Sequence, residues 1–445
     1  MRMETKIKII FLNVFFLFGI IGCEQDTTYI KTLSDADTYR MTMKQLTDVI
    51  VYDIFSPPVA SRIYAYSNVA AYEVLALSQP AKLNSLSGQL NELAKADPPD
   101  NEINPHLASI HAFLTVGKAF TFSEKKLSEF QTNFYEKLTT QGLPDVLKEE
   151  SLAYGEYIGN FILKWANEDM YKQTRSFPKY TVRDETKYWK PTPPDYMEGI
   201  EPHWNKIRPM VLKSADQFIP KEPEPFSMNK TSEFFNQLNE VYEVGRNLDE
   251  EQTEIARFWD CNPYASSHRG HAMFATKKIT PGGHWIGITS IASKQAGSSF
   301  TTTVAAFTQT SIALFDGFIS CWDEKWRSLL VRPETLINQY MDEDWKPLLQ
   351  TPPFPEYTSG HSVISRAAAV ALTDFYGPDF KFHDTTEVEF GLTARDFKSF
   401  LEASEEAAIS RLYGGIHYRM AIINGVDQGE DVGNWIINNL ETIKE

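Results

Sequence analysis

The sequence predicts an all-α fold, a large helical bundle whose functional pocket lies between helices of the C-terminal half. Apolar residues recur at three- and four-residue spacing through much of the chain, as in Leu107, Ile110 and Leu114. Strand-like alternation of apolar and polar residues is scarce. Helix-stopping pairs, Gly377-Pro378 and Gly414-Gly415, follow two regular helical patterns near the C-terminus.

Length and composition limit the classes of protein that fit. The chain has 445 residues, of which 42% are hydrophobic and 13% aromatic, so it can bury a sizeable core. Its formal net charge is −16. A nucleic-acid-binding face needs a basic excess, so we expect no nucleic-acid partner.

The N-terminus has the pattern of a targeting segment. Arg2 and Lys6 precede an apolar run that ends at Gly22 and is short for a membrane span. Cys23 then follows a small residue, which resembles a bacterial lipobox with Cys23 as the lipidated residue. We therefore expect a lipoprotein signal peptide over 1–22 and a lipid-anchored body in the bacterial cell envelope, periplasmic or at the cell surface. An ordinary signal peptide with an incidental cysteine is the alternative.

The rest of the chain divides by composition. A tether is expected over 23–36, a helical region over 37–171 and a second helical region over 229–445. Between them, residues 172–228 are rich in proline, which blocks long helices. Trp189 and Trp204 lie in this segment and favour an ordered chain that wraps the body, because such rings are normally buried.

A first group of candidate functional residues lies near position 330. Lys325 and Arg332 are seven residues apart, close to two helical turns, so we expect both cations on one face of a helix that Pro333 helps to close. A solvated basic face is the alternative. Asp316 lies in an apolar run upstream and needs a partner if buried, so it is predicted to hold structure or to orient the site from behind.

A second motif, Ser359-Gly360-His361, is predicted to lie at the N-terminus of a helix over 362–376. Free amides and the helix dipole favour an anion there, and glycine lets the backbone approach it closely. The dipole also disfavours imidazolium, which places His361 for proton transfer near neutral pH.

A third motif combines Arg411 and His417. Residues 404–413 read as an amphipathic helix, and Gly414 and Gly415 end it, so that His417 can turn back toward Arg411. A helix end with a structural histidine is the alternative. The three motifs together supply cations, a hydroxyl, amides and two imidazoles, which suits in-line chemistry at phosphorus or tight binding of a phosphate mimic.

These motifs, K-x6-R-P, S-G-H and S-R-x5-H in this order, resemble the signature shared by vanadium-dependent haloperoxidases and type 2 phosphatidic acid phosphatases. The stretches 189–194, 255–259 and 283–285 resemble the haloperoxidase side of this superfamily. The resemblance covers about residues 185–430, and it implies a helical enzyme with vanadate as a phosphate-competitive cofactor.

The resemblance also implies residue roles. His417 would be the vanadium ligand and His361 the acid–base residue opposite it, with Lys325 beside them as a further catalytic group. The groups that would hold the oxyanion are Lys325, Arg332, Ser359, Gly360 and Arg411. Trp322 and Phe354 fall where chloroperoxidase-like members have aromatic residues beside the halide and peroxide site.

Two positions depart from the family pattern. Thr358 stands where proline is usual, which removes no ligand. An acidic residue often follows the Phe-Trp pair and orients the site; here Asp260 or Asn262 could fill that role, and asparagine would weaken the charge network. If both regions line one pocket, Cys261 and Cys321 come close, and the sequence leaves open whether they pair.

The predicted function is halide oxidation by hydrogen peroxide at a histidine-bound vanadate, an oxidoreductase of the haloperoxidase type. The first alternative is an acid phosphatase that acts on a phosphate ester through a phosphohistidine at His417 and needs no cofactor. The second is a non-catalytic glycan-binding surface lipoprotein. The sequence gives no oligomeric state.

Overall fold

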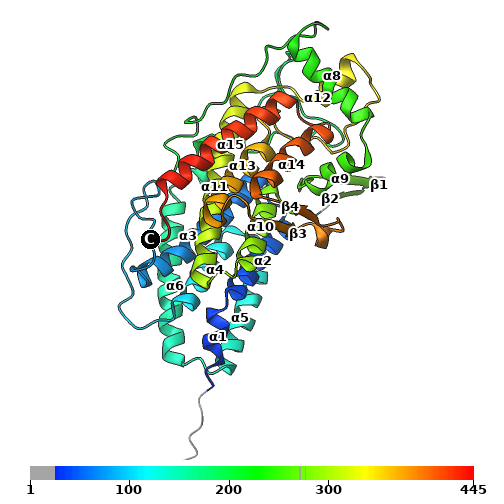
Figure 1. Ribbon diagram of the computed structural model, residues 1–445. Coiled ribbons are helices and arrows are strands. Elements are labelled where there is room, and N and C mark those ends of the chain that lie inside the picture. The colour runs from blue at the N-terminus through cyan, green and yellow to red at the C-terminus, as the bar shows by residue number, and fades with distance from the viewer. Residues whose placement is uncertain (1–25, 270–271, 276, 445) are drawn as a thin grey trace, which may run out of the picture.

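The computed structural model describes residues 26–269, 272–275 and 277–444, with side chains described outside 266–276. Fifteen α-helices and two short β-hairpins make up the described chain (Figure 1), so the all-α prediction is confirmed. The predicted signal peptide over 1–22 and the lipidation site Cys23 lie outside the described residues.

Seven helices form the first half of the molecule. Their bounds are α1 (Thr28–Ser34), α2 (Ala36–Asp53), α3 (Pro57–Ser78), α4 (Pro105–Phe120), α5 (Glu124–Thr140), α6 (Asp145–Ala166) and α7 (Tyr171–Thr174). Helices α3, α4 and α6 pack on one another. Start signals are clear in the sequence: Ser56 caps α3 by accepting a hydrogen bond from the Val59 amide, and two prolines occupy the first turn.

The second half contains the remaining helices and both hairpins. The elements are η1 (Trp204–Lys206), α8 (Glu233–Arg246), α9 (Glu250–Phe258), β1 (Ser266–Arg269), β2 (Ala272–Ala275), α10 (Pro281–Gln295), α11 (Phe300–Ser328), α12 (Pro333–Tyr340), α13 (Gly360–Tyr376), β3 (Phe382–Asp384), η2 (Val388–Phe390), β4 (Arg395–Phe397), α14 (Phe400–Tyr413) and α15 (Arg419–Asn439). Helix α13 packs against α11, α14 and α15. The hairpins pair β1 with β2 and β3 with β4, both antiparallel.

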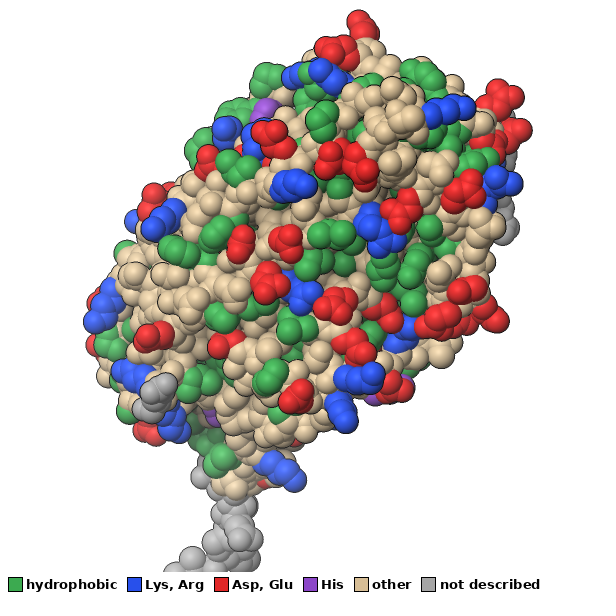
Figure 2. Space-filling view, turned by 45° about the horizontal axis from the view of Figure 1, so that its top comes forward, with side chains coloured by type: hydrophobic (Ala, Val, Ile, Leu, Met, Phe, Trp, Pro, Cys, Tyr) green, Lys and Arg blue, Asp and Glu red, His purple; other side chains and the backbone are tan. Residues whose placement is uncertain are grey.

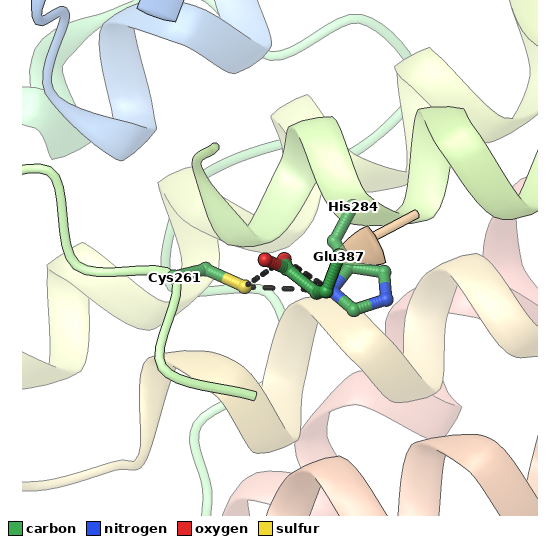
Figure 3. Close-up of side chains that lie close together, drawn as sticks. All are labelled: Cys261, His284 and Glu387. Atoms are coloured by element: carbon green, nitrogen blue, oxygen red, sulfur yellow. Dashed lines mark hydrogen bonds and ion pairs between the residues drawn. The ribbon is translucent and has the colours of Figure 1, made fainter. Parts of the chain in front are cut away.

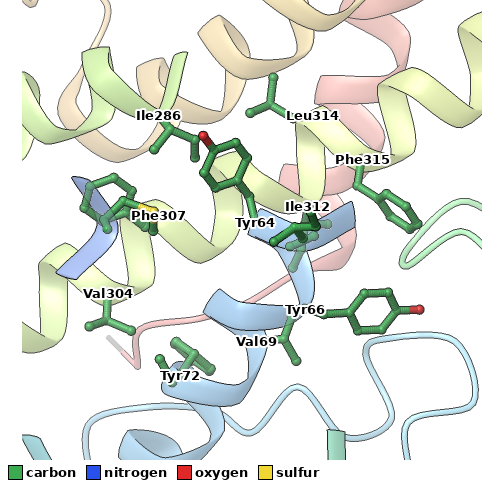
Figure 4. Packing of buried hydrophobic residues seen from close by; sticks show 14 of the residues in the cluster. Tyr64, Tyr66, Val69, Tyr72, Ile286, Val304, Phe307, Ile312, Leu314 and Phe315 are labelled. Carbon is green, nitrogen blue, oxygen red and sulfur yellow. The ribbon is translucent and has the colours of Figure 1, made fainter. Parts of the chain in front are cut away.

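Helix α11 joins the two halves, because it packs on α3 of the first and on α13 of the second. Figure 4 shows side chains of the shared core, with Tyr64, Tyr66 and Tyr72 of α3 near Val304 and Phe315 of α11. By length and hydropathy α11 is the one helix of the described chain that could cross a membrane, yet its apolar window is entirely buried. Its apolar composition therefore serves the core.

The expected tether over 23–36 is wrong where the structure describes it. Residues 28–34 form α1, and Tyr29 and Leu33 are buried in the core. Asp35 then caps α2, with its carboxylate accepting a 2.8 Å hydrogen bond from the Asp37 amide. Two apolar anchors and a cap outweigh the polar composition that predicted a flexible segment.

The proline-rich segment 172–228 is ordered but irregular, and Trp189 and Trp204 are fully buried in it. Burying each indole contributes about 4–6 kcal/mol before chain entropy. Asp316 of α11 fixes the same segment: its carboxylate accepts hydrogen bonds of 2.7–2.9 Å from the amides of residues 210–212.

Of the two roles predicted for Asp316, the structure shows the structural one and not the orienting one. Its carboxylate contacts the wrapping segment, and burial raises its pKa to about 6. Three backbone donors satisfy a carboxylate that would otherwise be costly in the core, so Asp316 is a structural anchor.

Figure 2 shows one face of the molecule, on which acidic and basic side chains are interspersed with apolar ones. The buried cations described next are therefore not a continuation of a basic patch on this face.

Candidate active site

Two of the three sequence motifs line one small cavity, whereas Lys325, Arg332 and Ser359 lie outside its wall; the two cations contact the lining residues His417 and Phe354. The volume of the cavity is about 40 Å³, roughly three times what one water molecule requires on the same scale. Among the predicted residues, the wall contains Asp260, Asn262, Trp322, Phe354, Gly360, His361, Arg411 and His417. These residues come from the segment after α9, from α11, from the loop before α13, from α13 itself, from α14 and from the segment that follows α14. The cavity therefore lies between helices of the C-terminal half, as predicted.

Lys325 and Arg332 do not share a helix, which corrects the sequence prediction. Helix α11 ends at Ser328, and Leu329 adopts a left-handed conformation with φ of 53°. Arg332 is extended and directly precedes Pro333, which begins α12 instead of closing α11. A residue before proline is disfavoured in the α region, so the chain turns and still brings both cations to one place.

Both cations are fully buried and bond to backbone carbonyls. The Lys325 ammonium donates to the carbonyls of Pro355 and Glu356, each at 3.0 Å, and to that of Thr358. The Arg332 guanidinium donates to backbone carbonyls of the residues on either side of the cavity, Phe354 at 3.0 Å and Ile416 at 2.8 Å.

The Ser359-Gly360-His361 motif begins α13, as predicted. Ser359 caps the helix, its hydroxyl accepting from the Ser362 amide at 3.4 Å. A β-carbon added at Gly360 would meet Trp322 at 3.7 Å and Lys325 at 4.0 Å, so the absence of a side chain leaves room beside both groups. His361 lies at the cavity wall, and within the described chain its Nε2 has no partner.

Arg411 lies in the last turn of α14, which ends at Tyr413 as the glycine pair predicts. Gly415 has φ of 77°, a conformation that glycine adopts without strain, and it turns the chain toward His417. The Arg411 guanidinium donates to the Trp259 carbonyl at 2.7 Å and to the Ser410 hydroxyl at 2.9 Å.

His417 is oriented by Glu356, a residue to which the sequence analysis gave no role. Glu356 Oε1 lies 2.8 Å from His417 Nδ1 and accepts the Tyr418 amide at 2.9 Å. His417 Nε2 accepts from the Arg332 guanidinium, which can only donate, so the Nδ1 atom carries the proton and donates it to Glu356. Arg332 Nη1 lies 3.1 Å from that Nε2.

Glu356 could have been suspected from its position. It is a lone carboxylate in an otherwise apolar and proline-rich stretch, three residues before Ser359. A buried carboxylate there needs a donor. The partner itself, sixty-one residues away, is visible only in the fold.

The electrostatics of the cavity are strongly unbalanced. Lys325, Arg332 and Arg411 are buried, and none of them forms an ion pair with a carboxylate among the described residues. Burial lowers the pKa of Lys325 to about 8 and those of Arg332 and Arg411 to about 10. Three buried cations without carboxylate partners are costly unless an anion joins them.

The two histidines and Glu356 do not supply this missing charge. Burial, with the neighbouring Arg411 or Arg332, holds the pKa values of His361 and His417 well below the ordinary value, so both rings are neutral. Burial also raises the pKa of Glu356 to about 7, although Arg332 and Lys325 oppose the shift.

A tetrahedral oxyanion such as vanadate fits these residues. It would supply the missing negative charge and acceptors for unpaired groups, which within the described chain include Arg332 Nη2. Gly360 leaves open space for such an anion, and His417 Nε2 offers a lone pair to its central atom.

Trp322 and Phe354 form an aromatic part of the wall, with ring centroids 5.0 Å apart. Phe354 also lies 5.0 Å from both the Lys325 ammonium and the Arg332 guanidinium carbon. Such contacts between cations and ring faces are favourable where water is excluded.

Asp260 and Asn262 also line the cavity but differ in their contacts. The Asp260 carboxylate pairs with Lys278, and its charge acts on Arg411. Asn262 holds its own loop: it accepts from the Tyr264 amide at 3.0 Å and donates to the Gln350 carbonyl at 3.3 Å. Asp260 is thus the acidic residue of this wall.

Cys261 and Cys321 do not form a disulfide; both are free and buried. Cys321 contacts the Thr358 carbonyl at 3.7 Å, whereas Cys261 faces His284 at 3.4 Å. The two thiols therefore belong to different environments.

Comparison with known proteins identifies the family. A family model, the VCPO second helical-bundle domain, matches residues 305–445. The crystal structure of a bacterial vanadium-dependent iodoperoxidase is 49% identical over 92% of this chain and 98% of its own, with a TM-score of 0.88. No curated protein sequence matches significantly.

Two further structures share the fold at low identity. They are the apo and holo forms of a bacterial vanadium-dependent chloroperoxidase, 17% and 18% identical over 86% and 87% of this chain. They cover 94% and 93% of their own chains, each with a TM-score of 0.65.

The chain belongs to the vanadium-dependent haloperoxidase family. This assignment confirms the predicted family, the vanadate cofactor and the haloperoxidase class of enzyme. It favours neither the phosphatase nor the glycan-binding alternative.

Proposed function

We propose that this enzyme oxidises iodide with hydrogen peroxide, using vanadate held in the cavity between α11, α13 and α14. One observation carries the proposal: Arg411 and His417 line the cavity, Lys325 and Arg332 are buried next to its wall, and none of these three cations has a carboxylate partner among the described residues. The choice of iodide rests on the iodoperoxidase relative, which is 49% identical.

The vanadate would be held from several sides. His417 Nε2 is the ligand atom, because Glu356 occupies the opposite nitrogen of the ring. Lys325, Arg332 and Arg411 neutralise the oxygens, and Ser359 with the Gly360 amide contributes donors at the helix N-terminus.

When bound, vanadate supplies a Lewis-acidic centre at which hydrogen peroxide is activated. The chain's own residues provide proton transfer and exclusion of water. His361 is neutral and its Nε2 is unpaired within the described chain, so it can accept a proton from hydrogen peroxide and later return it. Lys325, whose pKa burial lowers to about 8, stabilises negative charge that develops on oxygen and can also donate a proton near neutral pH.

The aromatic pair Trp322 and Phe354 suits a large and weakly hydrated halide. Both rings line the cavity, and the cations beyond Phe354 keep the potential positive there. Iodide loses little hydration when it enters such a wall, so we propose that these rings form the halide pocket.

The test compares two activities of the same preparation. Purified chain is freed of metal and phosphate, then assayed for oxidation of iodide, bromide and chloride with and without added vanadate, and for hydrolysis of a phosphate ester. We expect vanadate-dependent iodide oxidation that exceeds bromide and chloride oxidation. Ester hydrolysis that vanadate only inhibits, with no halide oxidation, would identify a phosphatase instead.

We also propose that the enzyme is a lipoprotein of the bacterial cell envelope, anchored through Cys23 and otherwise outside the membrane. The support is the lipobox-like sequence that ends at Cys23. Mass spectrometry of the membrane-extracted protein tests this: a diacylglyceryl group on an N-terminal Cys23 is expected. A membrane-extracted protein whose N-terminal residue is not a lipid-modified Cys23 contradicts the proposal.

A further inference from the structure

A second buried cluster of polar side chains lies beside the oxyanion cavity. Cys261, which also lines that cavity, projects toward His284 of α10 and Glu387 of the loop before η2 (Figure 3). The three side chains come from separate segments of the chain and are almost completely buried. A thiol, an imidazole and a carboxylate are ligands that zinc accepts.

The spacing of their donor atoms matches a metal's coordination sphere. Cys261 Sγ lies 3.4 Å from His284 Nδ1 and 3.5 Å from Glu387 Oε1, and the latter two atoms are 3.1 Å apart. Tetrahedral zinc, with bonds of about 2.0–2.3 Å, separates its ligand atoms by about 3.3–3.6 Å. The three donors therefore form one face of such a tetrahedron with little movement.

The orientation of His284 supports the same reading. Its other nitrogen, Nε2, lies 2.8 Å from a carboxylate oxygen of Asp384, which is fully buried. Metal-binding histidines usually donate their second N–H to a carboxylate in this way, which fixes the ring and leaves the opposite nitrogen for the metal. The Trp259 ring stacks on His284 with centroids 4.5 Å apart and further restricts the imidazole.

We propose that Cys261, His284 and Glu387 form a second metal site that binds a divalent cation of the zinc type. The thiolate and the imidazole favour zinc over magnesium or calcium. The fourth position is open to a water molecule, and the neighbouring cavity gives the ion a route to the ligands, since Cys261 lies in its wall.

The position of the site gives it a function in the enzyme. Residues 259–261 connect it to the oxyanion cavity: the Trp259 carbonyl accepts from Arg411 at 2.7 Å, and Trp259 also bonds to His361 through its backbone. A metal bound to Cys261 fixes this short segment from the other side. It therefore prepares Arg411 and His361 for the anion without touching it.

The decisive experiment uses Co²⁺ as a spectroscopic probe. The full chain carrying Cys23→Ser and Cys321→Ser has Cys261 as its only thiol. After removal of bound metal, and without vanadate, it is titrated with cobalt chloride and then with zinc chloride. We expect one Co²⁺ per chain, with a sulfur-to-cobalt charge-transfer band and visible bands of tetrahedral cobalt, both removed by zinc.

Matched variants separate metal binding from general damage. In the same background, Cys261→Ser is expected to abolish the charge-transfer band and weaken zinc binding at least about 10²-fold. His383→Ala is the control, because His383 neighbours Asp384 in β3 but is exposed. Its cobalt spectrum should be unchanged.

The outcomes are independent of the halide reaction. Absence of the charge-transfer band in the background protein, at cobalt concentrations that saturate ordinary protein sites, overturns the proposal. So does a band that survives Cys261→Ser. The charge-transfer band of the background protein is measured with Cys261 in place. The proposal can therefore be tested even if Cys261→Ser misfolds.

Discussion

Two neighbouring buried sites in this protein have opposite electrostatic imbalances. Lys325, Arg332 and Arg411 lie in or next to the wall of the oxyanion cavity, and burial raises the pKa of Glu356, the carboxylate that orients His417. The cluster behind the cavity places two carboxylates, Asp384 and Glu387, on a single imidazole. The three cations are costly in a low-dielectric interior without an anion. In the second cluster burial lowers the pKa of His284, but the charge of Asp384 outweighs it and raises that pKa above the ordinary value, so the imidazolium offsets only one of the two carboxylates. The difference indicates that one site is built for an anion and the other for a cation.

The two sites are mechanically connected although their chemistry differs. Trp259 and Cys261 lie on one short segment after α9, which contacts Arg411 on one side and His284 on the other. Substitutions that act on only one of the two sites therefore test best whether one binds an anion and the other a cation.

Removal of the histidine ligand should have the largest effect. His417→Ala deletes the nitrogen that Glu356 orients toward the anion. Vanadate-dependent iodide oxidation is expected to fall by at least about 10³-fold, while the cobalt spectrum of the Cys261 site remains. His383→Ala, an exposed histidine, should keep wild-type activity in the same assay. Unchanged activity of His417→Ala contradicts the assigned ligand.

Substitutions of Glu356, which acts through His417, and of a single buried cation should have the next largest effects on vanadate binding. Glu356→Ala leaves the Nδ1 proton without an acceptor and is expected to weaken vanadate binding about 10–100-fold. Glu356→Gln keeps an acceptor oxygen and should lose less. Equilibrium dialysis with vanadate measures both, and equal losses in the two variants would show that the charge of Glu356 matters rather than its orienting bond.

A single cation should have a smaller effect than the ligand. Lys325→Met removes one of three buried positive charges and is expected to weaken vanadate binding by about 1.5–3 kcal/mol. Lys179→Met, at an exposed ion pair with Glu198, is the control and should change nothing. If Lys325→Met binds vanadate with wild-type affinity, the lysine only stabilises the loop before α13 through its hydrogen bonds to the backbone carbonyls.

Glu73 lies outside both sites, so Glu73→Gln should leave halide oxidation unchanged but should change the pH dependence of stability. Burial raises its pKa from 4.5 to about 7, opposed by bonds from the Leu86 amide and the Ser85 hydroxyl. The folded protein therefore holds this proton more tightly, and the resulting stability is present below pH 4.5 and is lost as pH rises through about 7. Across this window the wild type should lose about 3 kcal/mol relative to Glu73→Gln. Urea unfolding at several pH values measures the difference, and parallel curves would contradict it.

Local patterns predicted the helical class, and they also located the start of α13 and the end of α14. They failed where a distant contact decides the structure. Tyr29 and Leu33 order a segment that composition describes as a tether, and Pro333 begins a helix where spacing alone predicted an ending. Neither result follows from periodicity, because both depend on tertiary packing or on the chain's turn at Leu329.

The sequence predicted those residues of the candidate site that belong to short motifs. Arg411 and His417 were identifiable because a glycine pair separates them and ends the helix. Glu356, Asp384 and Glu387 were not, because single carboxylates carry no spacing signal and their partners lie 61 to 126 residues away. For Asp316 the sequence predicted burial and a structural bond as one of two roles, but not its partners, the amides of residues 210–212.

The central claim is that the buried cations and His417 form an oxyanion site for vanadate. Equilibrium dialysis of the purified full chain against vanadate, with phosphate excluded, tests it directly. One vanadate per chain is expected in the wild type, released by excess phosphate, and none at the same concentration in His417→Ala. No bound vanadate in the wild type, or equal binding in the two proteins, contradicts the account.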